Sequence, residues 1–185
     1  MARVLVPLAE GFEEIEAVTV VDLLRRAGIE VHTASLDGPR VTGSHGIALM
    51  ADIALDAALA DDYDMIVLPG GMPGAEHLKN DPRVISLLRR FAAEGRYTAA
   101  ICAAPSVLAH AGLLEERAAT SFPGVLNANS APGIRLRDEA VVVDGKVVTS
   151  RGAGTAMEFG LALVGLLEGA EARRQVEERL QLAKG

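Results

Sequence analysis

Segments of strand length alternate with segments of helical periodicity along most of the chain. The apolar pattern predicts buried strands at residues 3–8, 31–35, 65–68 and 97–101, and two shorter extended pieces within residues 41–51. Apolar positions at helical spacing predict helices at residues 14–27, 82–94 and 105–111, and at about 155–168 and 170–182. The segment 65–68 is wholly apolar, which is typical of a central parallel strand.

Turn residues support these boundaries. Gly28 follows the first helix where a left-handed residue is favoured, and Asp81-Pro82 supplies an N-cap followed by a first-turn proline. Valine-rich segments on both sides of residues 144–146 predict a β-hairpin, because Asp-Gly favours a tight hairpin turn. Alternating strands and helices predict an α/β fold with a mainly parallel central sheet that helices cover on both faces.

One domain is expected over residues 1–185. The 185 residues contain no internal repeat, low-complexity segment or linker, and this length suits a single core. Hydrophobic residues make up 50% and charged residues 23% of the chain, which excludes extensive disorder. No apolar stretch approaches the roughly 20 residues of a membrane helix, so no membrane association is expected.

Charge and rare residue types narrow the functional classes. A net charge of −7 argues against a specific nucleic-acid surface. Aromatic residues make up only 3% of the chain, which disfavours stacking on bases or sugars. The single cysteine cannot form an internal disulfide and is typical of a reducing cytoplasm. The apolar start is too short for a signal peptide before it reaches Glu10, so we expect a cytoplasmic protein.

Candidate chemistry gathers at the carboxyl edge of the predicted sheet, where α/β proteins bind ligands. Cys102 follows a strand and precedes a helix, with small alanines around the turn, which is the pattern of a nucleophile elbow. The nearby helix N-terminus would stabilise a thiolate and lower the pKa of the thiol. The alternative is an inert buried cysteine that fills space.

Glu16 is the carboxyl group expected beside this thiol. It lies on the apolar stripe of the first helix together with Val20, Leu23, Leu24 and Ala27. Because that stripe should face the sheet, burial should raise the pKa of Glu16 and keep it protonated. A protonated carboxyl can donate a hydrogen bond to a thiolate and later transfer protons. The alternative is an acid that only the helix dipole favours.

Main-chain donors are expected from the Gly70-Gly71 pair and from Ala103. Together their N–H groups could form an oxyanion hole, although a simple tight turn explains the glycine pair equally well. The histidines show no metal-ligand spacing and no Cys–His–acid arrangement, so no metal site is expected; they are His32, His45, His77 and His110. His45 could lie near the pocket.

Four segments resemble those of the DJ-1/ThiJ/PfpI superfamily. They are LVPLAEGFEEIE (5–16), VLPGG (67–71), AAICAAP (99–105) and TSRGAGT (149–155). The resemblance runs in order over essentially the whole chain and is strongest to the bacterial YajL-like and animal DJ-1 branch. It implies a flavodoxin-like three-layer sandwich, no metal or organic cofactor, and a homodimer formed through the first helix around Ile15.

The resemblance also implies roles for single residues. Cys102 matches the oxidisable nucleophile and Glu16 the protonated carboxyl that touches it, while Gly71 and Ala103 match the main-chain donors. The remaining residues of the implied pocket are Gly70, His45, Phe122, Arg151 and Ala153.

Some pocket residues depart from the relatives. Phe122 replaces a histidine of the animal branch but resembles the bacterial branch, and it removes any mechanism that needs that imidazole. His45 replaces an arginine, which weakens an anion site, and Ala153 replaces a proline at the pocket rim. Ala103 stands where the protease branch has histidine, so peptidase activity is not expected.

Two functions fit these residues. In the first, Cys102 adds to a reactive aldehyde such as methylglyoxal, or to a glycated adduct, and Glu16 moves the protons. In the second, oxidation of Cys102 to a sulfinate regulates a protective protein or chaperone that has little catalysis. Both functions need the same sulfur, and the sequence does not choose between them.

Overall fold

A seven-stranded sheet runs through the centre of the protein, in the order β10-β11-β7-β6-β1-β2-β5. The computed structural model describes residues 1–182. The strands are β1 (Arg3–Leu8), β2 (Glu30–Ser35), β5 (Ile53–Ala54), β6 (Met65–Leu68), β7 (Tyr97–Ile101), β10 (Val141–Asp144) and β11 (Val147–Ser150). All neighbouring strands are parallel except β10 and β11, which form the predicted hairpin.

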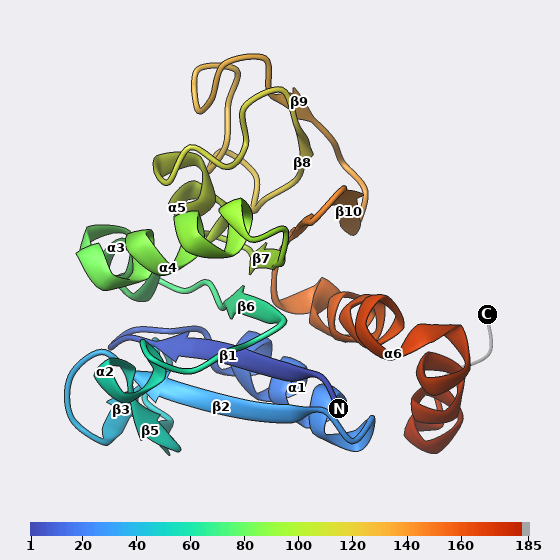
Figure 1. Cartoon of the computed structure of the whole chain (residues 1–185). Helices are drawn as coiled ribbons and strands as arrows, with labels where there is room; N and C mark the ends of the chain where they lie inside the picture. Colours follow the sequence, from blue (N-terminus) through green and yellow to red (C-terminus); the bar gives the residue numbers. More distant parts are fainter. Residues whose placement is uncertain (183–185) are drawn as a thin grey trace.

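Helices cover both faces of this sheet, as Figure 1 shows. They are α1 (Glu14–Arg26), α2 (Leu55–Ala58), α3 (Gly74–Asn80), α4 (Pro82–Ala93), α5 (Pro105–His110) and α6 (Ala156–Leu180). Successive strand residues point to opposite faces, so Val4 and Val6 of β1 pack with α1 and α6, whereas Leu5 packs with the α2–α5 layer. The expected three-layer α/β fold with a mainly parallel sheet is confirmed.

The predicted strands and helices are found within one or two residues of their expected ends. The pieces expected within residues 41–51 are β3 (Arg40–Thr42) and β4 (Ala48–Met50), which pair antiparallel. The two predicted closing helices form one element, α6, which is kinked at Gly169, where φ is 89°. The helix ends at Leu180 and not at Leu182, and residues 183–185 of the predicted domain lie outside the described residues.

Short elements escaped prediction. They are α2, α3, β5, the pair β8 (Ala118–Ala119) and β9 (Arg135–Leu136), and the 3-10 turn η1 (Ala153–Thr155). The two-residue strands are too short to show alternation, and α2, α3 and η1 are too short to show a helical period. The helix α5 is as short but was marked by Pro105 at its start and Gly112 after its end. Among the elements that escaped prediction, α3 begins at Gly74, three residues after Gly71, and therefore helps to shape the edge where chemistry is expected.

By length and composition, the stretch Ala153–Leu180 would suffice to cross a membrane. The core helix of a folded domain meets the same criterion, and Phe159, Leu163 and Val164 are buried against the sheet and α1. We therefore assign this helix to the outer layer of the sandwich.

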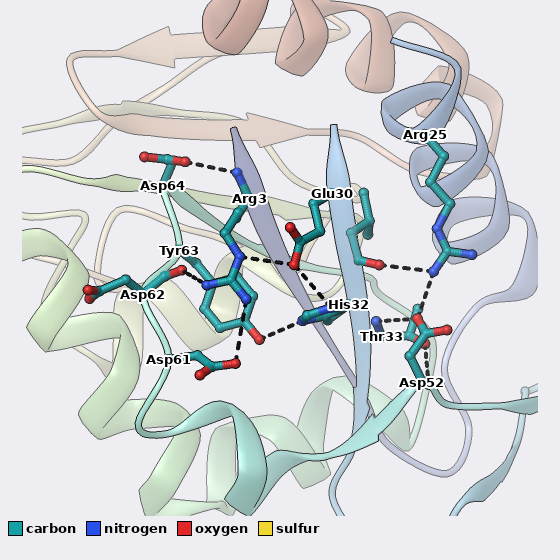
Figure 2. Close-up of polar contacts among 11 residues, drawn as sticks. Arg3, Arg25, Glu30, His32, Thr33, Asp52, Asp61, Asp62, Tyr63 and Asp64 are labelled. Carbon is teal, nitrogen blue, oxygen red and sulfur yellow. Dashed lines mark hydrogen bonds and ion pairs between the residues drawn. The ribbon is translucent and has the colours of Figure 1, made fainter. Parts of the chain in front are cut away.

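A polar network ties together the amino ends of β1, β2 and β6, opposite the candidate site (Figure 2). The guanidinium of Arg3 donates to Glu30 at 3.0 Å and lies 4.9 Å from the centre of the Tyr63 ring. The Tyr63 hydroxyl bonds Nδ1 of His32 at 2.9 Å, and burial raises the pKa of Tyr63 to about 12. A second group joins Asp52 to Thr33 and Arg25. These contacts fix the strands whose other ends position the site.

Candidate active site

Cys102 occupies a strained turn between β7 and α5. Its φ is +64°, a left-handed conformation that costs a residue other than glycine of the order of 1–3 kcal/mol. The main chain holds this turn from two sides, because Cys102 N donates to Ser150 O at 3.0 Å and Phe122 N donates to Cys102 O at 2.9 Å. A strained, well-supported turn with the side chain at the strand end is the geometry of a nucleophile elbow, and a space-filling cysteine would not require it.

Glu16 is fully buried on α1, as its place on the apolar stripe predicted. Its Oε2 accepts a hydrogen bond from Gly70 N at 2.7 Å, and its Oε1 has no hydrogen bond of ordinary geometry within residues 1–182. Burial raises the pKa of Glu16 to about 7, and the charge of Glu13 adds to the rise, while hydrogen bonds with Gly70 and Cys102 oppose it. A carboxyl with this pKa changes its protonation state at neutral pH.

Gly70 lies between the two chemical groups. A Cβ at this position would lie 2.6 Å from Cys102 Cβ and 2.8 Å from Glu16 Oε2, so only glycine lets the thiol and the carboxyl approach each other. Gly71 has a φ of +88°, and its N–H and that of Ala103 bond the Cys102 sulfur and lower the pKa of the thiol. The glycine pair therefore does more than make a turn.

The pKa of Cys102 moves opposite to the expectation of an acidic thiol. Burial and the charge of Glu16 raise it to about 12, and these two causes outweigh the donors Gly71 and Ala103. The expectation was wrong because it counted the stabilising helix end and neglected desolvation and a charged carboxylate neighbour. Glu16 and Cys102 form a coupled pair, in which the carboxyl loses its proton near neutral pH while the thiol keeps its own.

His45 lies over the start of α1, where its polar contacts within residues 1–182 are with Ser44, Glu13 and Glu14. Its side chain is 71% exposed, and Nδ1 lies 3.1 Å from Oε2 of Glu14. Ligand atoms of Glu13, Glu14 and His45 all lie within 4.8 Å of one another, a proximity that the sequence spacing did not suggest. Glu14 already accepts main-chain hydrogen bonds from His45 and Ile47, so this group serves to hold the β3–β4 turn against α1.

The other residues predicted for the pocket differ in how they are connected to the elbow. Phe122 is joined to Cys102 through its main chain, and its ring is half exposed. Arg151 follows Ser150, but its guanidinium pairs with the exposed Asp138 at 3.2 Å. Ala153 begins η1 and is partly exposed.

Glu13 is a site residue that the sequence reasoning missed. The helix dipole alone would account for an acid at this position, but the Glu13 carboxylate is also the N-cap, which accepts a hydrogen bond from Glu16 N at 2.9 Å. The signal was the spacing of three residues between two glutamates at a helix start, which is typical of N-terminal capping. The charge of Glu13 also raises the pKa of the Glu16 side chain through space.

The fold and the site together define a class of protein: an α/β sandwich with a cysteine elbow, a buried carboxyl and two main-chain donors at the carboxyl edge of the sheet. The model of the DJ-1/PfpI family matches residues 2–166, and the chain belongs to this family.

Relatives and solved structures support this family assignment. DJ-1 homolog A of Arabidopsis thaliana is 40% identical over 181 residues, or 97% of this chain and 46% of the relative, so the chain spans less than half of that protein. A glutathione-independent glyoxalase of Caenorhabditis elegans is 36% identical over 99% of this chain and 97% of its own length. A deglycase of Pyrococcus horikoshii is 35% identical over 80% and 89%. The structure of oxidized Toxoplasma gondii DJ-1 matches with a TM-score of 0.92 at 38% identity and covers all of both chains.

Proposed function

We propose that this protein protects against reactive aldehydes through Cys102, by converting methylglyoxal to lactate in the manner of a glyoxalase III, or by deglycating glyoxal-modified proteins or nucleotides. One observation carries the proposal: a thiol and a carboxyl that changes protonation near neutral pH lie together at a strained elbow, with main-chain donors from Gly71 and Ala103. The names of two relatives, a glyoxalase and a deglycase, support it.

The proposed reaction uses the Glu16 carboxyl and the Cys102 thiol together. Above pH 7, the Glu16 carboxylate accepts the thiol proton as the sulfur bonds the aldehyde carbon, and the N–H groups of Gly71 and Ala103 stabilise the new oxyanion. Glu16 passes this proton to the oxyanion and is a carboxylate again. It then removes the proton from the former aldehyde carbon and returns it to the neighbouring ketone carbon, while the hydroxyl proton moves to the ketone oxygen, which leaves a lactoyl thioester. Water hydrolyses this ester, so methylglyoxal and one water give lactate and one proton with the thiol restored. No metal or organic cofactor takes part in this scheme.

Lactate formation from methylglyoxal tests the proposal. Purified protein treated with a chelator should form lactate, and Cys102→Ala and Cys102→Ser should not. Each catalytic element is worth a factor of about 10² or more, so both losses should be large. Equal lactate signals from the wild type and both variants would refute catalysis at this site for that substrate, and release of unmodified amine from a glyoxal-treated peptide would test the deglycase alternative in the same way.

The alternative is a redox-sensing protective protein or chaperone in which oxidation of Cys102 to a sulfinate is the functional event. The relative solved in an oxidized form favours this alternative, as does the partial exposure of the Cys102 side chain. Mild peroxide should then add two oxygens to Cys102 selectively, since Gly71 and Ala103 can donate to the new oxygens. Whole-protein mass spectrometry after peroxide treatment distinguishes this outcome.

We further propose a cytoplasmic homodimer whose partners are small reactive carbonyl compounds or glycated adducts, with neither nucleic acid nor membrane among them. Ile15 and Val18 of α1 are 56% and 46% exposed. Val18 also lines one groove with Met50 of β4, so apolar side chains from two elements meet on this face. A second copy of the same surface would cover them in an isologous interface.

A further inference from the structure

Phe122 differs from every other phenylalanine of the chain. Phe12, Phe91 and Phe159 are at most 1% exposed, whereas Phe122 is 53% exposed. A phenyl ring costs free energy when it faces water, and the chain has few aromatic residues to leave exposed. Its exposure therefore requires a local reason.

The main chain holds Phe122 rigidly at the elbow. Its N–H donates to Cys102 O at 2.9 Å, and its carbonyl accepts from Val125 N at 3.0 Å and from Ser121 Oγ at 2.9 Å. Both peptide groups of Phe122 are thus bonded while its ring remains half in solvent. A ring on such a fixed support loses little conformational freedom when a ligand covers it.

The ring lies beside a segment that adjoins the Cys102 turn. Its Cδ2 would be 3.6 Å from a Cβ on Gly152, so the ring lies over the segment that follows β11. The last residue of β11, Ser150, accepts the hydrogen bond of Cys102 N. The main chain of Phe122 and the end of β11 are therefore both bonded to the main chain of Cys102, which places the ring in the neighbourhood of the nucleophile.

We propose that Phe122 is a specificity-determining residue that binds the apolar or aromatic substituent of a 2-oxoaldehyde attached to Cys102. The substrate class rests on the proposed function; the apolar subsite beside the thiol does not. For phenylglyoxal the reaction balances with one water: the aldehyde carbon is oxidised to a carboxylate, the ketone carbon is reduced to a carbinol, and mandelate and one proton result.

Alkylation of Cys102 tests the subsite without any need for turnover. The thiol displaces bromide from phenacyl bromide or iodide from iodoacetamide, and each rate is divided by that of glutathione. The wild type should favour phenacyl bromide, and Phe122→Ala should lower the phenacyl-to-iodoacetamide ratio by roughly five- to tenfold, as expected when a substituent loses an aromatic partner. Val143→Ala, which truncates a similarly exposed apolar residue on β10, should leave the ratio unchanged.

An unchanged ratio in Phe122→Ala would overturn the inference. Should this variant fail to fold, Phe122→Gln keeps the length of the side chain, removes the aromatic face and must show the same fall. In parallel, mandelate formation from phenylglyoxal is compared with glycolate formation from glyoxal. If neither compound is turned over but Phe122→Ala shifts the alkylation ratio, the proposed function is refuted and the subsite is supported. If the compounds are turned over but the ratio does not shift, the proposed function is supported and the subsite is refuted.

Discussion

Oε2 of Glu16 accepts a hydrogen bond from the main-chain N–H of Gly70 at 2.7 Å, across 54 residues of sequence. This bond joins the first turn of α1 to the segment after β6, and it directs the buried carboxyl towards the Cys102 thiol. It also makes the site depend on a residue without a side chain, because Gly70 has no room for a Cβ.

Gly70→Ala should separate the thiol from the carboxyl. The added methyl would overlap atoms of Cys102 and Glu16, so we expect about 1–3 kcal/mol lower stability and a large loss of thiol reactivity. Thermal unfolding and iodoacetamide alkylation measure the two effects. Gly154→Ala is the matched control, because nothing lies within 4 Å of a Cβ there, and it should behave as the wild type. Full reactivity in Gly70→Ala would contradict this account of the site.

The reactivity of Cys102 should rise with pH around a midpoint near 7. The pKa of Glu16 is raised to about 7, and loss of this first proton from the coupled pair gives the form that can deliver a thiolate. In Glu16→Gln no carboxylate can accept the thiol proton, so the midpoint should move up by at least about one pH unit towards the ordinary thiol value. Alkylation rates between pH 5 and 10 measure both midpoints, and superimposable profiles would mean that Glu16 does not act on the thiol.

Ionisation of Glu16 should lower the free energy of unfolding at alkaline pH. Its pKa is about 7 in the folded chain against an ordinary value of 4.5, so the folded state binds the proton more tightly than the unfolded chain does. The stabilisation is complete below pH 4.5 and is lost as the pH rises through 7. Glu16→Gln should therefore be more stable than the wild type at pH 8, by about 2–3 kcal/mol, and the gain should shrink at pH 5.

Urea unfolding at pH 5 and pH 8 measures these stabilities. Glu14→Gln is the control variant, because the pH dependence of its effect on stability should have the opposite sign. Burial raises the pKa of Glu14, but its main-chain hydrogen bonds, including those from His45 and Ile47, prevail and lower it. Ionised Glu14 therefore stabilises the folded state at pH values above the pKa that Glu14 has in the unfolded chain, and this stabilisation is lost in acid. Glu14→Gln should destabilise more at pH 8 than at low pH, and a parallel response of the two variants would refute the assignment.

Ile15→Asp should weaken the proposed dimer. Static light scattering of the wild type should give twice the 19.3 kDa mass of the chain, and the variant should approach the mass of one chain, since a buried unpaired charge disfavours an apolar contact. Val143→Asp changes an equally apolar exposed position on β10 and should leave the mass unchanged. A wild-type mass of one chain would refute the homodimer.

The sequence by itself determined the order of the long elements and the place of the nucleophile. Apolar segments of four to six residues and helices of twelve or more carry enough periodicity to be recognised locally, and the six-residue α5 was marked by its flanking Pro105 and Gly112. The burial of Glu16 followed from its position on the apolar stripe of α1, and the elbow at Cys102 followed from small residues between a strand and a helix. These features depend on neighbours within one or two turns of the chain.

Only the tertiary structure decided how the groups act on each other. The pKa of Cys102 depends on desolvation and on the charge of Glu16, which lies 86 positions earlier in the chain, so local sequence gave the wrong direction. The exposed ring of Phe122 is positioned by the main-chain N–H of Phe122, which donates to Cys102 O, and the sequence spacing of the two residues does not predict this bond. Electrostatic and packing energies depend on distance in space, and that distance is set by the folding of the chain and not by separation along it.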